Sequence, residues 1–153
     1  MKIDTYNKKE ILKNKKLIKR LQQIDKECFP IFYKNVETWS FENYLKKIKR
    51  LKVYVAKERN KVIGSLLLEG DDKNERIKNI AVDTNFQRKG IGSALLKETL
   101  FHKKDIYLHV RTTNIKAIEL YKKYNFKIEK IEKEACYEGD CFLMKRKHTK
   151  ELQ

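Results

Sequence analysis

The chain of 153 residues is 41% hydrophobic and 10% aromatic, which excludes a disordered chain and suits one packed domain over residues 1–153. Its 37 Lys and Arg residues outnumber its 21 Asp and Glu residues and leave a formal net charge of +16, but they are spread along the whole chain. Basic proteins attract polyanions, yet no aromatic-rich RNA-binding signature accompanies these lysines, so no specific nucleic-acid site is expected.

Two helices are predicted before the first strands. Apolar residues recur at helical spacing from about Ile11 to Phe29, and Pro30 ends that helix because it lacks the N–H that would continue it. A shorter helix is predicted from Phe41 to about Arg50, with Ser40 as its N-cap.

Strands follow these helices. The segment 51–58 alternates in polarity, and the segment 61–70 follows it after a turn at residues 59–61, so together they predict a hairpin. The apolar segment 75–82 predicts a third strand.

The second half of the chain alternates helices and strands. The pattern predicts a helix over 90–102, a strand over 105–110, a helix over 114–124, and closing strands over 126–134 and 141–146 joined by a turn at 137–140. A central strand–helix–strand unit in a mixed, mostly antiparallel sheet flanked by helices makes the fold α/β, or α+β.

The cysteines and histidines predict neither a disulfide framework nor a metal site. Cys28, Cys136 and Cys141 form no C-x-x-C pair, so we expect reduced thiols, and the three histidines take no metal-ligand spacing with them. No apolar run approaches membrane-spanning length, and the N-terminal segment lacks the apolar core of a signal peptide. We therefore expect a cytoplasmic protein that makes no membrane contact.

The turn with the sequence QRKGIG, residues 87–92, lies between an apolar strand and an amphipathic helix. The free N–H groups and the dipole at a helix start bind phosphate oxygens. Gly90 and Gly92 let a pyrophosphate approach the backbone, and Arg88 and Lys89 add positive charge. The spacing is neither GxxxxGK[ST] nor GxGxxG, so the turn favours a phosphorylated ligand of another kind.

Two motifs carry a resemblance to a known family. Q-R-K-G-I-G-S-A-L-L resembles the acetyl-CoA-binding motif [QR]-x-x-G-x-[GA] of the GNAT superfamily, and VRTTNIKAIELYKKYNF is similar to its second motif, N-x-x-A-x-x-x-Y-x-x-x-G-F. Their order and separation also match. Asn125 replaces the usual Gly before Phe126, but Asn tolerates a left-handed turn. The resemblance covers essentially the whole chain and implies the GNAT fold and an acetyl-CoA-dependent N-acetyltransferase.

The resemblance also implies where the cofactor binds. In the family, the strand before the turn splays from the next parallel strand, and the pantetheine arm of acetyl-CoA pairs with its backbone. The residues that the resemblance assigns to acetyl-CoA are Ile80, Ala81, Val82, Gln87, Arg88, Lys89, Gly90, Ile91, Gly92, Ser93, Asn114, Ala117 and Tyr121.

The implied reaction is direct attack of a neutral amine on the thioester in a ternary complex. Tyr121 matches the Tyr that protonates the departing thiolate. Alternation places Tyr107, His109 and Arg111 on one strand face. N-terminal acetyltransferases carry a His or Glu base at this strand position, so the resemblance makes His109 the candidate base, with solvent as the alternative. Arg76 lies where some eukaryotic N-terminal acetyltransferases carry a second catalytic Tyr.

The acceptor is inferred from the segment IDKECFPIFY, which is similar to the first loop of ribosomal-protein-alanine and Naa50-like N-terminal acetyltransferases. The resemblance places Phe29, Pro30, Tyr33 and Tyr137 along the peptide groove and implies the N-terminus of a protein or peptide as substrate. Small amines such as polyamines or aminoglycosides remain an alternative, although a cationic protein repels polycations. A non-catalytic acyl-CoA-binding domain and a basic nucleic-acid-binding or structural domain are further alternatives. Ribosome association and a monomeric or homodimeric state stay open.

Overall fold

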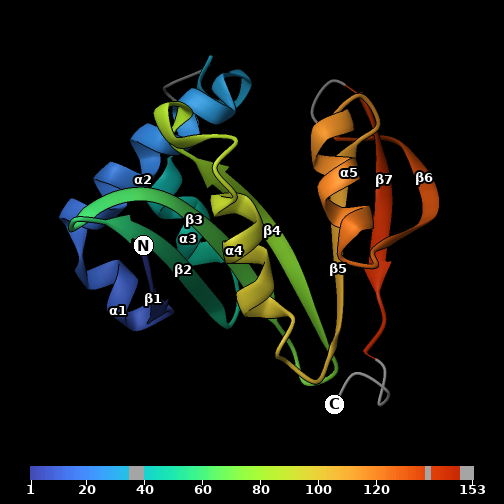
Figure 1. Ribbon diagram of the computed structural model, residues 1–153, viewed down its shortest axis with the longest axis horizontal. Helices are drawn as coiled ribbons and strands as arrows, with labels where there is room; N and C mark the ends of the chain where they lie inside the picture. Colours follow the sequence, from blue (N-terminus) through green and yellow to red (C-terminus); the bar gives the residue numbers. More distant parts are fainter. Residues whose placement is uncertain (35–39, 137–138, 149–153) are drawn as a thin grey trace.

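The computed structural model describes residues 1–34, 40–136 and 139–148, which build one seven-stranded sheet in the order β1-β2-β3-β4-β5-β7-β6 (Figure 1). The β4–β5 pair is parallel and the other neighbouring pairs are antiparallel, which confirms the predicted mixed, mostly antiparallel sheet. The strands are β1 (Lys2–Asn7), β2 (Leu51–Glu58), β3 (Lys61–Gly70), β4 (Asn74–Val82), β5 (Asp105–Arg111), β6 (Lys127–Cys136) and β7 (Gly139–Arg146).

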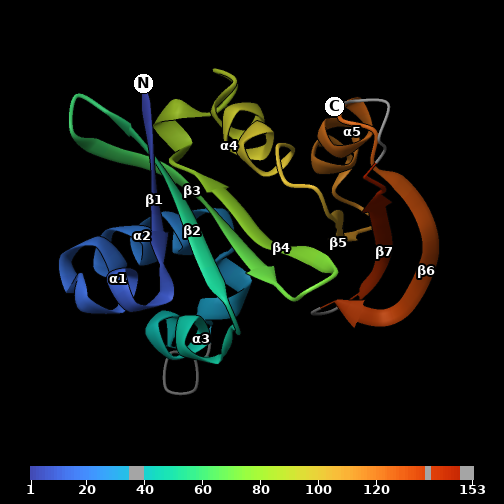
Figure 2. The same cartoon turned by 90° about the horizontal axis from the view of Figure 1, so that it is seen from below.

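Helices cover both faces of the sheet (Figure 2). One face, here called the α1–α3 face, packs against a core that includes Leu21, Phe41 and Val53. The opposite α4–α5 face packs against a second core that includes Leu95 and Leu108. The helices are α1 (Lys8–Lys13), α2 (Lys15–Cys28), α3 (Phe41–Lys47), α4 (Ile91–Thr99) and α5 (Ile115–Lys123), with short 3₁₀ turns η1 (Pro30–Tyr33) and η2 (Thr84–Phe86).

The N-terminal segment differs from the sequence prediction. The single helix expected over 11–29 is two helices, because Asn14 ends one and starts the next. Its backbone N–H donates to the Ile11 carbonyl, while its side chain accepts the N–H of Leu17. The helical spacing of apolar residues continues across Asn14, so the sequence pattern did not reveal the break. The edge strand β1 was not predicted, since it is mostly polar and pairs only along β2.

Several local predictions are confirmed. The Ser40 side chain caps α3 by accepting the N–H of Asn43, although the helix ends at Lys47 rather than near residue 50. Asn60 in the predicted hairpin turn is left-handed, with φ 65°. Asn125 is left-handed as well, with φ 69°, so the chain turns out of α5 without a glycine.

The cysteines correct another expectation. Cys136 and Cys141 form a disulfide across the β6–β7 hairpin, with their Cα atoms 5.6 Å apart, whereas Cys28 is a free thiol. Their spacing of five residues gave no C-x-x-C signal, because it is the antiparallel pairing of the strands that brings them together. Within the ranges that the structure describes, no helix is both long enough and apolar enough to cross a membrane.

The parallel strands β4 and β5 part after three residue pairs. The registered pairs join Asn74 to Asp105, Glu75 to Ile106 and Arg76 to Tyr107. Beyond them β4 continues along β3, with an irregularity at Leu67/Leu68, and β5 continues along β7. The two strands consequently diverge toward the end that carries the turn before α4 (Figure 1).

Candidate functional site

The turn before α4 has the geometry of an anion cradle. Gly90 takes a left-handed conformation with φ 79°, and a Cβ built on it would meet no atom within 4 Å. Arg88 is also left-handed, with φ 63°. Among the described residues, the backbone N–H groups of 88–93 find no hydrogen-bond acceptor. These N–H groups at a helix start are therefore available to oxygens of a phosphate.

The start of α4 also faces α5. A Cβ on Gly92 would lie 3.8 Å from Cδ2 of Leu120, an ordinary van der Waals distance. The nearby Ser93 hydroxyl and the charge of Lys97 lower the pKa of Tyr124 at the end of α5. Ser93 therefore lies close enough to the end of α5 to influence a residue there.

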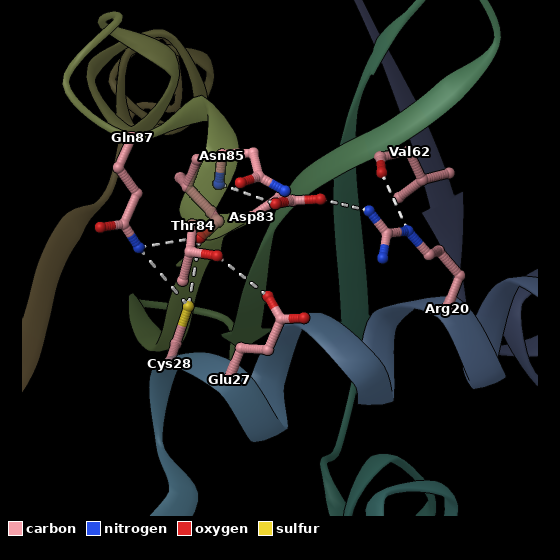
Figure 3. A network of polar contacts seen from close by, with 9 residues as sticks. Arg20, Glu27, Cys28, Val62, Asp83, Thr84, Asn85 and Gln87 are labelled. Carbon is pink, nitrogen blue, oxygen red and sulfur yellow. Dashed lines mark hydrogen bonds and ion pairs between the residues drawn. The ribbon is translucent and has the colours of Figure 1, made fainter.

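The end of β4 is held by a polar network (Figure 3). The Val82 carbonyl accepts hydrogen bonds from Nε2 of Gln87 at 3.0 Å and from Sγ of Cys28 at 3.2 Å. Gln87, predicted to bind the cofactor, here fastens the turn to the strand. Ile80 and Ala81 precede Val82 on the splayed half of β4, where Ala81 is buried.

Asp83 anchors the same corner. Its carboxylate accepts the N–H of Asn85 at 2.9 Å and pairs with Nη2 of Arg20 at 2.5 Å (Figure 3). Burial works to raise the pKa of Asp83, but the Asn85 N–H and the Arg20 charge outweigh it and hold that pKa below its usual value. The corner is thus built from α2, β4 and the turn together.

Tyr121 lies in the α4–α5 core. Its ring packs against Phe126 with centroids 5.7 Å apart, and burial raises the pKa of Tyr121 to about 12. Such a phenol keeps its proton at neutral pH, so it can donate that proton but is a poor base. The Asn114 side chain caps α5 by accepting the N–H of Ala117 at 3.2 Å, which places both residues at the start of the helix that carries Tyr121.

The opposite face of β5 carries His109. The predicted alternation is confirmed, because Ile106, Leu108 and Val110 are buried in the α4–α5 core while His109 is on the other face. Nε2 of His109 lies 3.0 Å from Oε2 of Glu132 on β6. An ionised carboxylate can only accept a hydrogen bond, so Nε2 is the donor in this contact, and in the neutral imidazole Nδ1 carries the lone pair.

The contact with His109 changes the pKa of Glu132. Partial burial works to raise the pKa of Glu132, but the hydrogen bond and charge of His109, with the nearby Lys130, lower it below its usual value. Glu132 therefore stays ionised beside the imidazole.

The predicted peptide loop follows α2. Phe29 ends the helix, Pro30 begins η1, and the ring of Phe29 lies 6.4 Å from that of Phe32. Tyr33 is buried, and its hydroxyl donates to Asp25 at 2.6 Å, so this hydroxyl anchors the loop. The other oxygen of Asp25 accepts Nδ2 of Asn79 on β4 at 2.5 Å. Tyr137 lies outside the described residues.

The comparison with protein families decides the assignment. The acetyltransferase (GNAT) family model matches residues 18–126, which include the turn, the splayed strands and α5. The chain belongs to the GNAT family of acetyltransferases.

Curated relatives with similar sequences are named as one kind of acetyltransferase. The N-alpha-acetyltransferase of Sulfolobus acidocaldarius is 38% identical over 91 residues, which cover 55% of this chain and 51% of that protein. The chain thus spans about half the length of the curated relatives it matches.

Solved structures share the fold along the whole chain. The ribosomal-protein-S18-alanine N-acetyltransferase of Escherichia coli superposes with a TM-score of 0.75 at 20% identity, covering 97% of this chain and 94% of that one. An aminoglycoside 6'-N-acetyltransferase complexed with coenzyme A gives 0.77 at 14% identity, covering 97% and 98%. The two are named for different acceptors, so the fold alone does not select an acceptor.

The sequence did not reveal the residues that hydrogen-bond or pair with the candidate site residues. Glu132 lies in a run of alternating Lys and Glu residues that marks no member as special. Asp25 and Asn79 are 54 residues apart, and Asp83 pairs with a residue 63 positions away. Asp25 did carry one signal, as a carboxylate on the apolar stripe of a helix between Leu21 and Cys28.

Proposed function

We propose that this GNAT chain transfers the acetyl group of acetyl-CoA to the α-amino group of a protein or peptide N-terminus. The observation that carries the proposal is the parting of β4 and β5 beyond Arg76 and Tyr107, next to a turn with free N–H groups. A strand edge and an anion cradle in line can take a ligand with an amide-bearing arm and a pyrophosphate.

The residues present fit acetyl-CoA. The open space at Gly90 and the unpaired N–H groups of 88–93 suit the pyrophosphate, while Arg88 and Lys89 add charge. The backbone of 80–82 can pair with the amides of the pantetheine arm, because β5 has left that edge of β4. Ala117 and Asn114 lie at the start of α5, on the β5 side of the split.

Two side chains can move the protons, His109 on β5 and Tyr121 on α5. Acetyl-CoA supplies the acetyl group as an activated thioester. Nδ1 of His109 accepts a proton from the acceptor ammonium, directly or through water, while Glu132 holds Nε2. The Tyr121 hydroxyl supplies a proton to the sulfur, as its raised pKa permits. Backbone N–H groups of the splayed strand can polarise the carbonyl.

A peptide N-terminus is the acceptor that the comparisons support best. The curated relatives at 38% and 40% identity are named N-alpha-acetyltransferases. The Phe29–Tyr33 segment also lies against β4, since Tyr33 and Asn79 share Asp25. The alternative is a small amine, but the formal charge of +16 disfavours polycationic acceptors.

The test is an assay of CoA release with acetyl-CoA and peptides that differ in their first residues. Polyamines and an aminoglycoside serve as alternative acceptors, and each peptide is paired with its N-terminally blocked form that keeps an internal Lys. We expect turnover on free N-termini and none on the blocked forms. Turnover confined to polyamines or aminoglycosides would contradict the acceptor, and CoA binding with no turnover on any amine would contradict the transferase.

A further inference from the structure

Arg76 lies at the point where the two parallel strands part, and it forms no ion pair with any residue that the structure describes. Its guanidinium carbon lies 4.6 Å from the ring centroid of Tyr107, the residue it faces in the last β4–β5 pair. Its Nε is buried and has no hydrogen-bond partner among the described residues. A buried unsatisfied N–H is costly, so its retention here calls for an explanation.

The carboxylates nearby are engaged elsewhere. Glu69 faces Arg76 across the β3–β4 pair, but its Oε2 accepts the backbone N–H of Lys49 at 3.0 Å. Asp71 accepts the backbone N–H groups of Lys73 and Asn74 at 2.8 Å and 2.7 Å. In the part of the chain that the structure describes, no carboxylate forms an ion pair with Arg76. Among the described residues its Nη atoms have no hydrogen-bond partner, and they are not fully buried.

Arg76 opens onto the face that carries His109. It lines a cavity of about 180 Å³ together with Tyr107, Lys49 and Glu69. Tyr107 precedes His109 by two residues on the same face of β5, a distance of about 7 Å along a strand. The Arg76 charge also acts on Tyr44 of α3, against the burial that raises the pKa of Tyr44 to about 12. Arg76 therefore faces the acceptor side of the sheet.

We propose that Arg76 binds a carboxylate of the acceptor, so that the enzyme prefers N-termini with Asp or Glu among their first two residues. This inference rests on the proposed function. A planar guanidinium held against an aromatic ring presents paired N–H groups that match a carboxylate. Extended chain spans about 3.3–3.6 Å per residue, so an amine at His109 places the first two side chains within reach of Arg76.

The experiment compares kcat/KM for peptides that are identical except at one position. Glu, Gln and Lys alternate at the second residue, and Asp, Asn and Lys at the first. For the wild-type protein we expect the acidic peptide to exceed its neutral counterpart by about tenfold, and this ratio to fall as salt is added.

Three variants separate the carboxylate site from general charge. For Arg76→Gln, we expect kcat/KM for the acidic peptide to be close to that for the neutral peptide. For Arg76→Glu, we expect the Lys peptide to have the highest kcat/KM. Arg59→Gln removes the same charge from the exposed β2–β3 turn and should keep the wild-type ratio. The melting temperature and CoA binding show whether each variant is folded. If the Arg76 variants do not fold, the comparison of acidic and neutral peptides with the wild-type protein still tests the carboxylate preference.

The outcomes bear on separate claims. Equal wild-type rates on acidic and neutral peptides would overturn the carboxylate site while leaving the proposed function intact. An acidic preference that survives Arg76→Gln in a folded protein would overturn it too. Failure to acetylate any free N-terminus would instead count against the proposed function.

Discussion

His109 on β5 and Glu132 on β6 meet across β7, with Nε2 and Oε2 3.0 Å apart. Both strands pair with β7, where His109 is opposite Leu143 and Glu132 is opposite Cys141. The side chains therefore reach over the intervening strand on one face of the sheet. The contact selects one imidazole tautomer and leaves Nδ1 as the proton acceptor.

Replacing Glu132 with Gln is expected to lower kcat about tenfold with little change in the affinity for acetyl-CoA, because His109 loses its orienting carboxylate. Removing a neighbouring negative charge also favours the neutral imidazole, so the acidic limb of the pH–rate profile should move to lower pH. Rate measurements from pH 5 to 9 check both effects.

The matched control for this prediction is His109→Ala, which should lose both activity and that limb. Acceptors with different amine pKa values separate the imidazole from the amine itself, whose pKa is about 7.7–8.0 for an α-amino group. If the limb follows the acceptor and persists in His109→Ala, the base is solvent and Glu132 has no part in the reaction.

Gly92→Val should weaken acetyl-CoA binding strongly, because the larger side chain crowds the turn where we place the pyrophosphate. The fold should tolerate the change better, since a Cβ at Gly92 meets Leu120 at an ordinary 3.8 Å. A ligand that binds only the native state raises the melting temperature. Thermal unfolding with and without CoA should show a rise for the wild type that Gly92→Val reduces. No rise in the wild type would contradict the cofactor site.

Tyr121→Phe should reduce turnover by about 10²–10⁴-fold where chemistry limits the rate, because it removes one proton donor. The ring and its contact with Phe126 remain, so stability and acetyl-CoA affinity should be nearly unchanged. Single-turnover rates and CoA titration check this prediction. Unchanged single-turnover rates would remove Tyr121 from the mechanism.

Asp25 makes stability depend on pH. Burial raises the pKa of Asp25 against the hydrogen bonds of Tyr33 and Asn79, so the native state holds its proton to higher pH than the unfolded chain does. Its contribution is therefore greatest below the unfolded value of about 3.9 and falls as pH rises through the raised native value.

Asp25→Asn should remove this dependence and be neutral or stabilising at pH 7, as measured by urea unfolding at several pH values. Asp25→Ala is the contrast, because it removes the acceptor of both the Tyr33 hydroxyl and the Asn79 amide and should cost about 1–3 kcal/mol. Equal loss of stability in both variants at every pH would show that the carboxylate charge is needed.

Features that depend on neighbouring residues could be predicted from the sequence. Ser40 caps α3, Asn125 turns the chain out of α5, and β5 alternates between a buried and an accessible face. The turn before α4 belongs to this group, because Gly90 needs its left-handed conformation for a purely local reason. The fold class and the place of this glycine-containing turn were therefore determined by sequence pattern alone, while phosphate binding there stays a prediction.

Other features arise only when distant segments pack together. Edge strand β1 is held by its pairing with β2, and Cys136 meets Cys141, five residues on, only because β7 folds back along β6. The same holds for the contact of Glu132 with His109 and for the contact of Arg76 with the Tyr107 ring. Side chains far apart in sequence meet according to strand register and crossing geometry, and a shift of one residue would turn each to the other face of the sheet. The sequence by itself thus determined the glycine-containing turn and most of the elements from α3 onward, while the tertiary structure decided which charges are paired around that turn.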